Sequence, residues 1–200
     1  MSRELEQARE LVRMLEEKEK AEKVKLSALK PGQSFLIGND EFIVLDQFAD
    51  GSEETLAISK QFLAENVEFG STPDYKDSNL RKVIEADILP KIEADIGAEN
   101  IIQRKADLTT VDMQKDFGDV VCKARPLTFD EARKYNNLIA NPDLDDWSWT
   151  CTPWSTSGRG RDYSVAVVGL RGVLGGYGCG NGYGVRPVLY LKSSIFVSLK

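Results

Sequence analysis

Residues 169–184, GLRGVLGGYGCGNGYG, are half glycine, and the last of them begins GVRPVLYL, a run with the pattern of a buried strand. Glycine loses more conformational freedom on folding than any other residue. A segment so rich in glycine is therefore costly to order unless strands hold it at both ends. YSVAVV at 163–168 and VRPVLYL at 185–191 have the apolar pattern of such strands. We expect a β framework that carries this segment at its surface.

The composition of the whole chain excludes several function classes. Its 200 residues suffice for one domain with a core and an appendage. A net charge of −6 without a lysine-rich face argues against nucleic acid as a partner. No run approaches the length of a membrane span, and the charged residues 1–20 contain no apolar h-region, so we expect neither a span nor a secretory signal. The expected location is cytoplasmic or virion-associated.

The reactive side chains argue against catalysis. The chain has no histidine, which removes the commonest general base and the commonest zinc ligand. Its three cysteines, Cys122, Cys151 and Cys179, are far apart and form no CxxC pair, so reduced thiols are expected. We expect no catalytic residue, no metal ion and no cofactor.

Residues 1 to about 29 predict one amphipathic helix, and residues 31–200 a domain that follows it. Apolar residues with the 3-4-3 spacing of a coiled-coil seam are Leu5, Ala8, Val12 and Leu15, and the spacing resumes at Leu26 and Leu29. Such a helix could dock on its own domain or join protomers into a homo-oligomer. Pro31-Gly32 ends it.

From Gln33 onward the period of hydrophobicity changes to two. SFLIG (34–38), EFIVLDQF (41–48) and ETLAIS (54–59) predict three strands, with hairpin turns at Asn39-Asp40 and Asp50-Gly51. A further strand is expected at Ile101-Ile102.

Two helices are expected after these strands. Residues 78–96 present an apolar helical face, with Ser78 as N-cap and Pro90 as a kink or break. A second helix starts at Thr128, which forms a capping box with Glu131, and Asn141-Pro142 closes it. Together the elements predict an α+β fold of short antiparallel strands and two helices.

All three tryptophans lie within WSWTCTPW, residues 147–154. If this run is a strand, Trp147 and Trp149 share one face, and we expect both to pack in the core. Tyr163 and the valines that follow it are also core candidates. Arg186, which precedes Pro187 inside the closing strand, is expected to form a structural ion pair or to be a hydrogen-bonded core residue.

Residues 155–184 contain no Lys, Glu, Gln, Met or Trp, although these five types make up 43 of the other 170 residues. At that frequency, the probability that thirty consecutive residues contain none of the five types is about two in ten thousand. This figure does not take into account that turns disfavour long side chains. The five missing types are those that no codon ending in a pyrimidine can encode. Asn codons randomised at their first two bases would produce the residues that are present. An ordinary glycine-rich set of turns is the alternative explanation.

The motifs WSWTCTPW, YSVAVV and GVRPVLYL resemble those of one family, the C-type-lectin-like variable proteins of diversity-generating retroelements from gut bacteria and their phages. Those proteins carry a tryptophan-rich block often written WWLRSPG, a valine-rich strand, a variable segment and GVRPALWL. The similarity covers about residues 32–200, and its most specific part is the closing motif. The first block departs from the family pattern.

The resemblance implies a C-type-lectin-like fold that displays a hypervariable surface, diversified by an error-prone reverse transcriptase, to bind an unknown protein or cell-surface ligand. Many glycines of the segment would then be products of randomised codons. Three arginines against one aspartate within residues 155–184 would favour an acidic partner. The residues expected to bind the ligand are Ser155, Ser157, Gly158, Arg159, Gly160, Arg161, Gly169, Leu170, Arg171, Leu174, Gly176, Tyr177, Gly178, Gly180, Asn181 and Tyr183.

Three other functions remain as alternatives. A calcium-dependent lectin would carry EPN or QPD and WND triplets, and Asn141-Pro142-Asp143 is the nearest match, which we interpret as a helix stop. A formylglycine-generating oxidase, which the closing strand also resembles, would need Cys151 and Cys179 as its paired cysteines. The third alternative is a structural phage or bacterial module whose loops bind nothing.

Overall fold

The computed structural model describes residues 5, 9–10, 23–48 and 51–199. Most of the helix expected before Lys23 lies outside the described residues. From Lys23 to Leu29 the expectation of a helix is wrong, because Lys23–Lys25 form strand β1 and Leu26–Ala28 a single 3₁₀ turn, η1. β1 pairs with β15 (Phe196–Ser198), and Leu26 and Leu29 are buried in the domain core. Pairing with a strand remote in sequence has overridden the local helical spacing.

The larger sheet contains the three strands predicted after Gln33. They are β2 (Ser34–Ile37), β3 (Asp40–Phe48) and β4 (Glu54–Ser59), and all three predictions are confirmed. The turn between β2 and β3 lies at Gly38-Asn39, one residue earlier than expected, and Gly38 takes the positive φ of +57° that this turn requires. Of the second expected turn, Asp50 lies outside the described residues.

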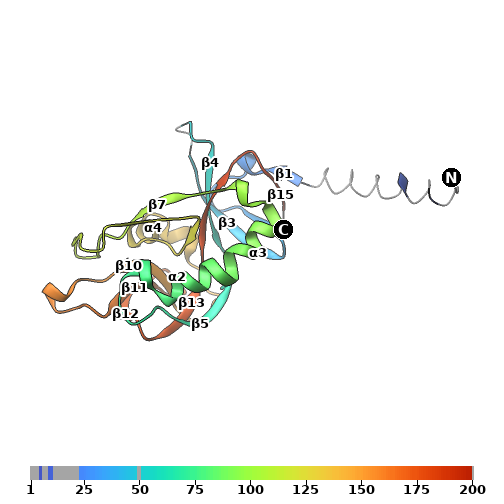
Figure 1. Cartoon of the computed structure of the whole chain (residues 1–200). Coiled ribbons are helices and arrows are strands. Elements are labelled where there is room, and N and C mark those ends of the chain that lie inside the picture. Colours follow the sequence, from blue (N-terminus) through green and yellow to red (C-terminus); the bar gives the residue numbers. More distant parts are fainter. Residues whose placement is uncertain (1–4, 6–8, 11–22, 49–50, 200) are drawn as a thin grey trace.

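The strand order in this sheet is β1-β15-β2-β3-β4-β14-β6, and β9 also pairs with β14 (Figure 1). Its remaining strands are β14 (Val188–Lys192), β6 (Ile101–Ile102) and β9 (Ala124–Arg125). Every described pairing in the sheet is antiparallel. The strand expected at Ile101-Ile102 is confirmed as β6.

A second sheet, with the order β12-β11-β10-β13-β5, lies at the end of the molecule away from β1 and β15 (Figure 1). Its strands are β5 (Ala64–Glu68), β10 (Ser148–Pro153), β11 (Ser164–Val168), β12 (Leu174–Gly178) and β13 (Gly182–Val185). β7 (Arg104–Asp107) and β8 (Asp119–Cys122) form a separate hairpin. The strand expected at 185–191 is divided at Arg186-Pro187, where the chain passes from β13 in this sheet to β14 in the larger one.

One helix of 18 residues runs from Asn79 to Ile96 as three consecutive segments. They are α2 (Asn79–Val83), the π-helical η3 (Ile84–Ile88) and α3 (Leu89–Ile96). Ser78 is its N-cap, as predicted, with Oγ accepting the N–H of Arg81 at 3.0 Å. The irregularity expected from Pro90 takes the form of the π turn, in which the N–H of Leu89 bonds to the oxygen of Ile84. Proline then falls in the first turn of α3, where no N–H donor is required.

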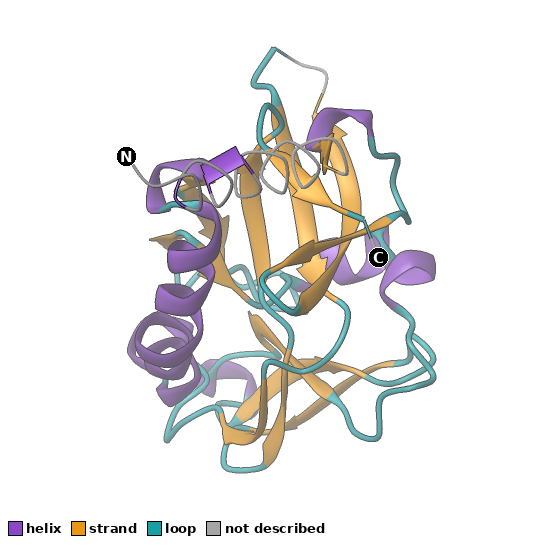
Figure 2. Cartoon of the chain, turned by 90° about the vertical axis from the view of Figure 1, so that its right-hand side faces the viewer, coloured by secondary structure: helices purple, strands orange, loops and turns teal. Residues whose placement is uncertain are grey.

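The second predicted helix is also confirmed and consists of α4 (Phe129–Lys134) and α5 (Asn136–Ile139). Thr128 and Glu131 form the expected capping box. Three 3₁₀ turns, η2 (Tyr75–Asp77), η4 (Ala98–Asn100) and η5 (Ser157–Arg159), complete the helical elements of the described chain. Helices, strands and loops are distinguished by colour in Figure 2.

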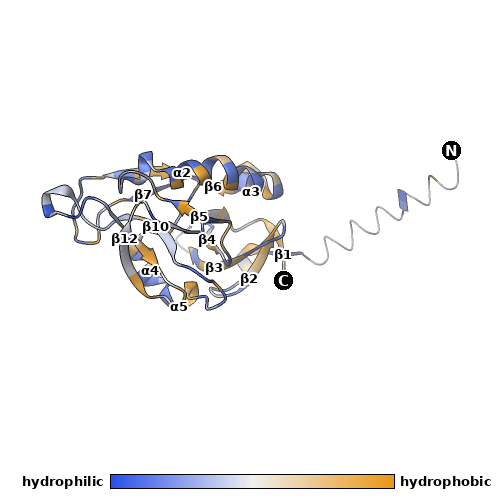
Figure 3. Ribbon diagram, turned by 90° about the horizontal axis from the view of Figure 1, so that it is seen from below, coloured by the Kyte–Doolittle hydropathy of each residue, from blue (hydrophilic) through white to orange (hydrophobic). Residues whose placement is uncertain are grey.

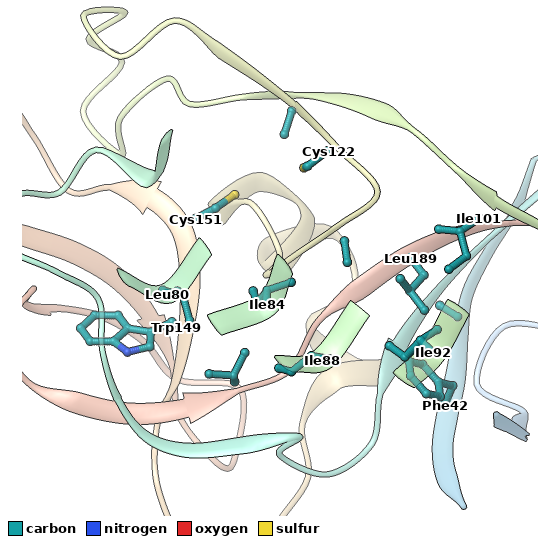
Figure 4. Packing of buried hydrophobic residues seen from close by; sticks show 14 of the residues in the cluster. Phe42, Leu80, Ile84, Ile88, Ile92, Ile101, Cys122, Trp149, Cys151 and Leu189 are labelled. Carbon is teal, nitrogen blue, oxygen red and sulfur yellow. The ribbon is translucent and has the colours of Figure 1, made fainter. Parts of the chain in front are cut away.

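Both faces of the larger sheet are buried, because helices cover it from opposite sides (Figure 3). Alternate residues of β3 point to opposite faces, so that Phe42 and Val44 join one apolar cluster and Ile43 and Leu45 the other. The first cluster includes the row Leu80, Ile84, Ile88 and Ile92 of the long helix, which extends from Trp149 at one end to Phe42 and Leu189 at the other (Figure 4). The second cluster includes Ala132, Tyr135 and Ile139 of α4 and α5.

A buried ion pair joins β9 to α4. The guanidinium of Arg125 donates from Nη1 and Nη2 to the two carboxylate oxygens of Glu131, at 2.6 and 2.7 Å. Burial acts to raise the pKa of Glu131, but hydrogen bonds from Arg125 and from the N–H of Thr128 outweigh it and hold that pKa below its usual range. The pair therefore stabilises the folded state only while Glu131 is ionised.

Replacing Glu131→Gln should lower the free energy of unfolding by about 3–5 kcal/mol at pH 7, because Arg125 would remain buried without its counter-charge. A carboxyl whose pKa is lowered on folding contributes stability above its unfolded pKa of about 4.3 and loses it as the pH falls through the folded value. Urea unfolding at pH 7 and pH 4 should therefore show a smaller loss on acidification in the variant than in the parent protein. Glu85→Gln, which removes a solvent-exposed ion pair with Arg81, is the matched control and should cost about 1 kcal/mol or less.

Candidate ligand-binding surface

The five-stranded sheet carries the residues predicted to bind a ligand, and most of them are accessible. None of Leu170, Tyr177 and Asn181 lies in the deep interior. Nine of them are exposed to solvent: Ser157, Gly158, Arg159, Gly160, Arg161, Arg171, Tyr177, Gly180 and Asn181. Six others are half-buried: Gly169, Leu170, Leu174, Gly176, Gly178 and Tyr183. Ser155 is the exception, because its side chain is buried.

Apart from Tyr177, which lies in β12, the exposed residues fall into three loops at the two ends of the β11–β12 hairpin. The loop 156–163 and the turn 179–181 meet at one end, where the N–H of Cys179 donates to the oxygen of Tyr163 at 2.9 Å. The turn 169–173 lies at the other end and is held by Asn136, whose Nδ2 donates to the oxygen of Gly172 at 2.7 Å. The segment 155–184 therefore presents two separate areas, joined by the strands between them.

The loop 156–163 is anchored by Asp112, which belongs to the loop between β7 and β8. Ser155 Oγ donates to Asp112 Oδ2 at 2.6 Å, and Arg159 Nε lies 3.9 Å from the same oxygen. Hydrogen bonds from Ser155 and Thr110 lower the pKa of Asp112. The prediction that Ser155 is displayed to a ligand is wrong, because its hydroxyl is used in this anchor.

Aromatic rings connect the surface of the sheet to its core. Centroid separations are 5.1 Å for Trp147–Tyr177, 5.6 Å for Tyr177–Tyr183 and 4.9 Å for Tyr183–Trp149. Trp149 is buried, as predicted, and its Nε1 donates to the oxygen of Val67 at 2.7 Å. Trp147 is only half-buried, and Tyr177 is 38% exposed, so this end of the row is open to a ligand.

Tyr163 was expected in the core, and this prediction is wrong. Its side chain is 52% exposed, whereas the valines that follow it in β11 are buried as predicted. Tyr163 precedes the strand, and its ring lies over Gly178 and Gly180 at the surface. Strand β11 thus begins at Ser164, one residue later than the apolar pattern indicates, and it is buried continuously from Val165 to Val168.

Several glycines of the segment are required by the rings and side chains packed on them. A Cβ added at Gly176 would lie 2.3 Å from Cε3 of Trp154, and one added at Gly184 would lie 2.3 Å from Cε1 of Phe62. At Gly169 the nearest atom would be Cζ3 of Trp147, at 3.1 Å. A larger residue at these positions would displace a ring or another side chain, so these glycines have packing roles whatever the origin of their codons. The absence of a side chain at each of them leaves room for an aromatic ring.

Two adjoining hollows open beside the turn 169–173. The first is lined by Asp145, Asp146 and Trp147 from the loop before β10, and by Gly169, Leu170, Arg171 and Val173 from the turn. The second shares both aspartates and is otherwise lined by Phe62, Glu65, Asn66 and Gly184. Sequence reasoning did not select Asp145, Asp146 or Phe62. The acidic run DLDDW at 143–147 was the one signal that could have directed attention to this loop.

The three cysteines are free and lie in the apolar core. Burial raises the pKa of the Cys151 thiol to about 12 and that of the Cys179 thiol above its usual value. Both thiols are therefore protonated at neutral pH, which disfavours thiolate chemistry. Within the described part of the chain, no group of three or more His, Cys, Asp or Glu side chains is placed to hold a metal ion.

No family model, curated protein or solved structure is significantly similar to this chain. Among the described residues, no helix has the length and apolar character needed to cross a membrane.

The packing of rings on glycine leads to a test at Gly176. Gly176→Ala should lower the free energy of unfolding by about 1–3 kcal/mol, since the new methyl group would displace the Trp154 ring. Gly158→Ala is the matched control, because a Cβ there would have its nearest neighbour at 3.8 Å and the residue is exposed. Chemical denaturation followed by tryptophan fluorescence would compare the two, and equal stabilities would contradict the packing role of Gly176.

Proposed function

We propose that this chain is a ligand-binding protein with a C-type-lectin-like fold, and that residues 155–184 form a hypervariable surface diversified by a retroelement. The observation that carries the proposal is that this segment contains both a buried strand and exposed loops. Its strand β11 is buried at Val165, Ala166 and Val167, while the loops on either side of that strand expose short polar side chains and arginines. Such loops on a rigid framework can change their residues with little effect on the core.

The composition of the exposed positions supports the same function. Among the exposed residues of this segment, Arg, Ser, Asn and Tyr combine forked donors, adaptable hydrogen bonding and rigid contact area. All four can be encoded by codons that end in a pyrimidine. The set of displayed side chains is narrower than the whole segment, because Ser155, Gly169 and Gly176 have packing roles. Of the residues predicted to bind the ligand, those with exposed side chains are Ser157, Arg159, Arg161, Arg171, Tyr177 and Asn181.

The pre-ordering of the loops also favours binding. The N–H of Asn141 donates to the oxygen of Leu170 at 2.8 Å, and the loop 156–163 is held through Asp112. Loops that are ordered before the ligand arrives lose less conformational entropy on binding.

The oxidase alternative receives less support. It requires Cys151 and Cys179 to act as a reactive pair, and both are buried with raised thiol pKa values. A nucleophilic or copper-binding cysteine needs the thiolate form at working pH. Turnover of a cysteine-containing peptide substrate with oxygen and copper, abolished by Cys179→Ser, would favour the oxidase instead.

The genetic test of the proposal is direct. The DNA beside this gene should contain a reverse transcriptase gene and a near-identical template repeat of the region encoding 155–184. Copies of the gene should differ almost only at displayed positions, and only between codons that end in a pyrimidine. Differences spread evenly over the chain would contradict diversification.

A stability test addresses the display role of the same positions. The triple variant Arg161→Ser, Arg171→Ser and Asn181→Ser should keep the free energy of unfolding within about 1 kcal/mol of the parent value, because all three side chains are exposed. Arg186→Ser, at a buried arginine that donates to two carbonyl oxygens, is the comparison and should lose about 3 kcal/mol or more. If the triple variant lost as much stability as Arg186→Ser, the loops would be structural rather than displayed.

A further inference from the structure

We propose that the hollow lined by Trp147, Asp145 and Asp146 receives a basic side chain, arginine or lysine, of a protein ligand. This inference rests on the proposed function and names the class of partner. The three residues lie outside 155–184 and would be present in every diversified version of the protein. The turn 169–173 lies inside that segment and would supply the variable wall.

The carboxylates of the two hollows are available to a ligand. Asp145 and Asp146 line both hollows, Glu65 lines the second, and none of the three forms an ion pair with any described residue. One oxygen of Asp146 accepts the N–H of Trp147 at 2.7 Å, which fixes the orientation of this carboxylate. The other oxygen of Asp146 and both oxygens of Asp145 make no hydrogen bond to the described protein.

The cations near this surface do not neutralise these carboxylates. Arg171 lines the first hollow but forms no ion pair with either aspartate among the described residues, and Arg159 lies near Asp112 instead. At the two hollows, the negative charge of acidic residues from outside 155–184 therefore exceeds the positive charge that the arginines of this segment contribute. The arginines of 155–184 favour an acidic partner for the segment as a whole, whereas the complement of this hollow is a cation.

The apolar part of the hollow suits the stem of a long basic side chain. Leu170, Val173 and the indole of Trp147 offer apolar surface, against which the methylene groups of lysine or arginine pack while the charged head reaches the carboxylates. A guanidinium can also bond two carboxylate oxygens at once and lie against an aromatic ring. The ring of Trp147 lies against Gly169 and Gly175, where an added Cβ would lie 3.1 and 3.4 Å from its Cζ3. Of the two, only a side chain at Gly169 would press closely on the indole wall of the hollow.

The test uses N-acetyl-arginine amide as the probe and N-acetyl-citrulline amide, its uncharged isostere, as the comparison. Titration of the ¹⁵N-labelled full chain should move the amide of Trp147 and its indole N–H saturably with the arginine compound. Citrulline should bind at least about fivefold more weakly, since it lacks the charge that the carboxylates recognise. The arginine affinity should fall with added salt, as expected for a partly exposed charge pair.

The double variant Asp145→Asn/Asp146→Asn should weaken arginine binding about fivefold or more. The matched control Asp87→Asn/Asp116→Asn makes the same change in net charge at exposed residues outside both hollows and outside 155–184, and it should leave binding unchanged. Equal affinities for arginine and citrulline, or equal loss in both double variants, would overturn the inference. These results are independent of the genetic test. If gene copies vary only within 155–184 but the hollow does not bind arginine, this inference is refuted and the proposed display function stands.

Discussion

The two sheets of this protein are joined where two chain segments pass between them side by side. One segment leaves β4 after Ser59 and enters β5, and the other leaves β13 after Val185 and enters β14. Backbone hydrogen bonds link them at both ends, from Ser59 N–H to the oxygen of Pro187 at 3.1 Å and from Leu63 N–H to the oxygen of Val185 at 2.9 Å. Arg186 lies in this crossing and donates to the oxygens of Ser59 and Ile139, at 2.9 and 2.7 Å. Burial lowers the pKa of Arg186 to about 10, which still leaves it charged at neutral pH. The placement of the smaller sheet, and of every loop upon it, depends on this junction.

Aromatic rings and glycines are the paired elements of the smaller sheet. Trp154 lies on Gly176, Phe62 on Gly184 and Trp147 on Gly169, so that flat rings occupy the space that side chains would otherwise fill. Packing of this kind allows a strand of five residues with three glycines, β12, to remain ordered at the edge of a sheet. This packing also distinguishes two kinds of residue within 155–184: glycines against which a ring packs, and residues whose side chains face solvent. Only the second kind is free to vary without loss of stability.

The proposed binding surface combines a fixed part and a variable part. The acidic loop before β10 and the indole of Trp147 come from the framework, whereas the turn 169–173 comes from the segment with the unusual composition. A fixed acidic wall would confine the ligands to those with an accessible basic group, and the variable wall would select among them. Charge complementarity contributes more to specificity and association rate than to affinity, which suits a surface whose shape is meant to change.

The sequence by itself determined the local features of this protein. Apolar alternation located β2, β3 and β4, and Ser78 and Thr128 marked the starts of two helices, because each of these features depends on a few neighbouring side chains. The closing motif indicated a structural role for Arg186, but its partners, the oxygens of Ser59 and Ile139, are distant in the sequence. Tertiary structure decided what depends on distant partners. Leu26 belongs to the core because β1 pairs with β15, Tyr163 is exposed because the loop ends after it, and Gly176 must be glycine because Trp154 lies on it. The meeting of Asp145 and Asp146 with residues 169–173 likewise arises only when β10 and β11 pair, which no local spacing can express.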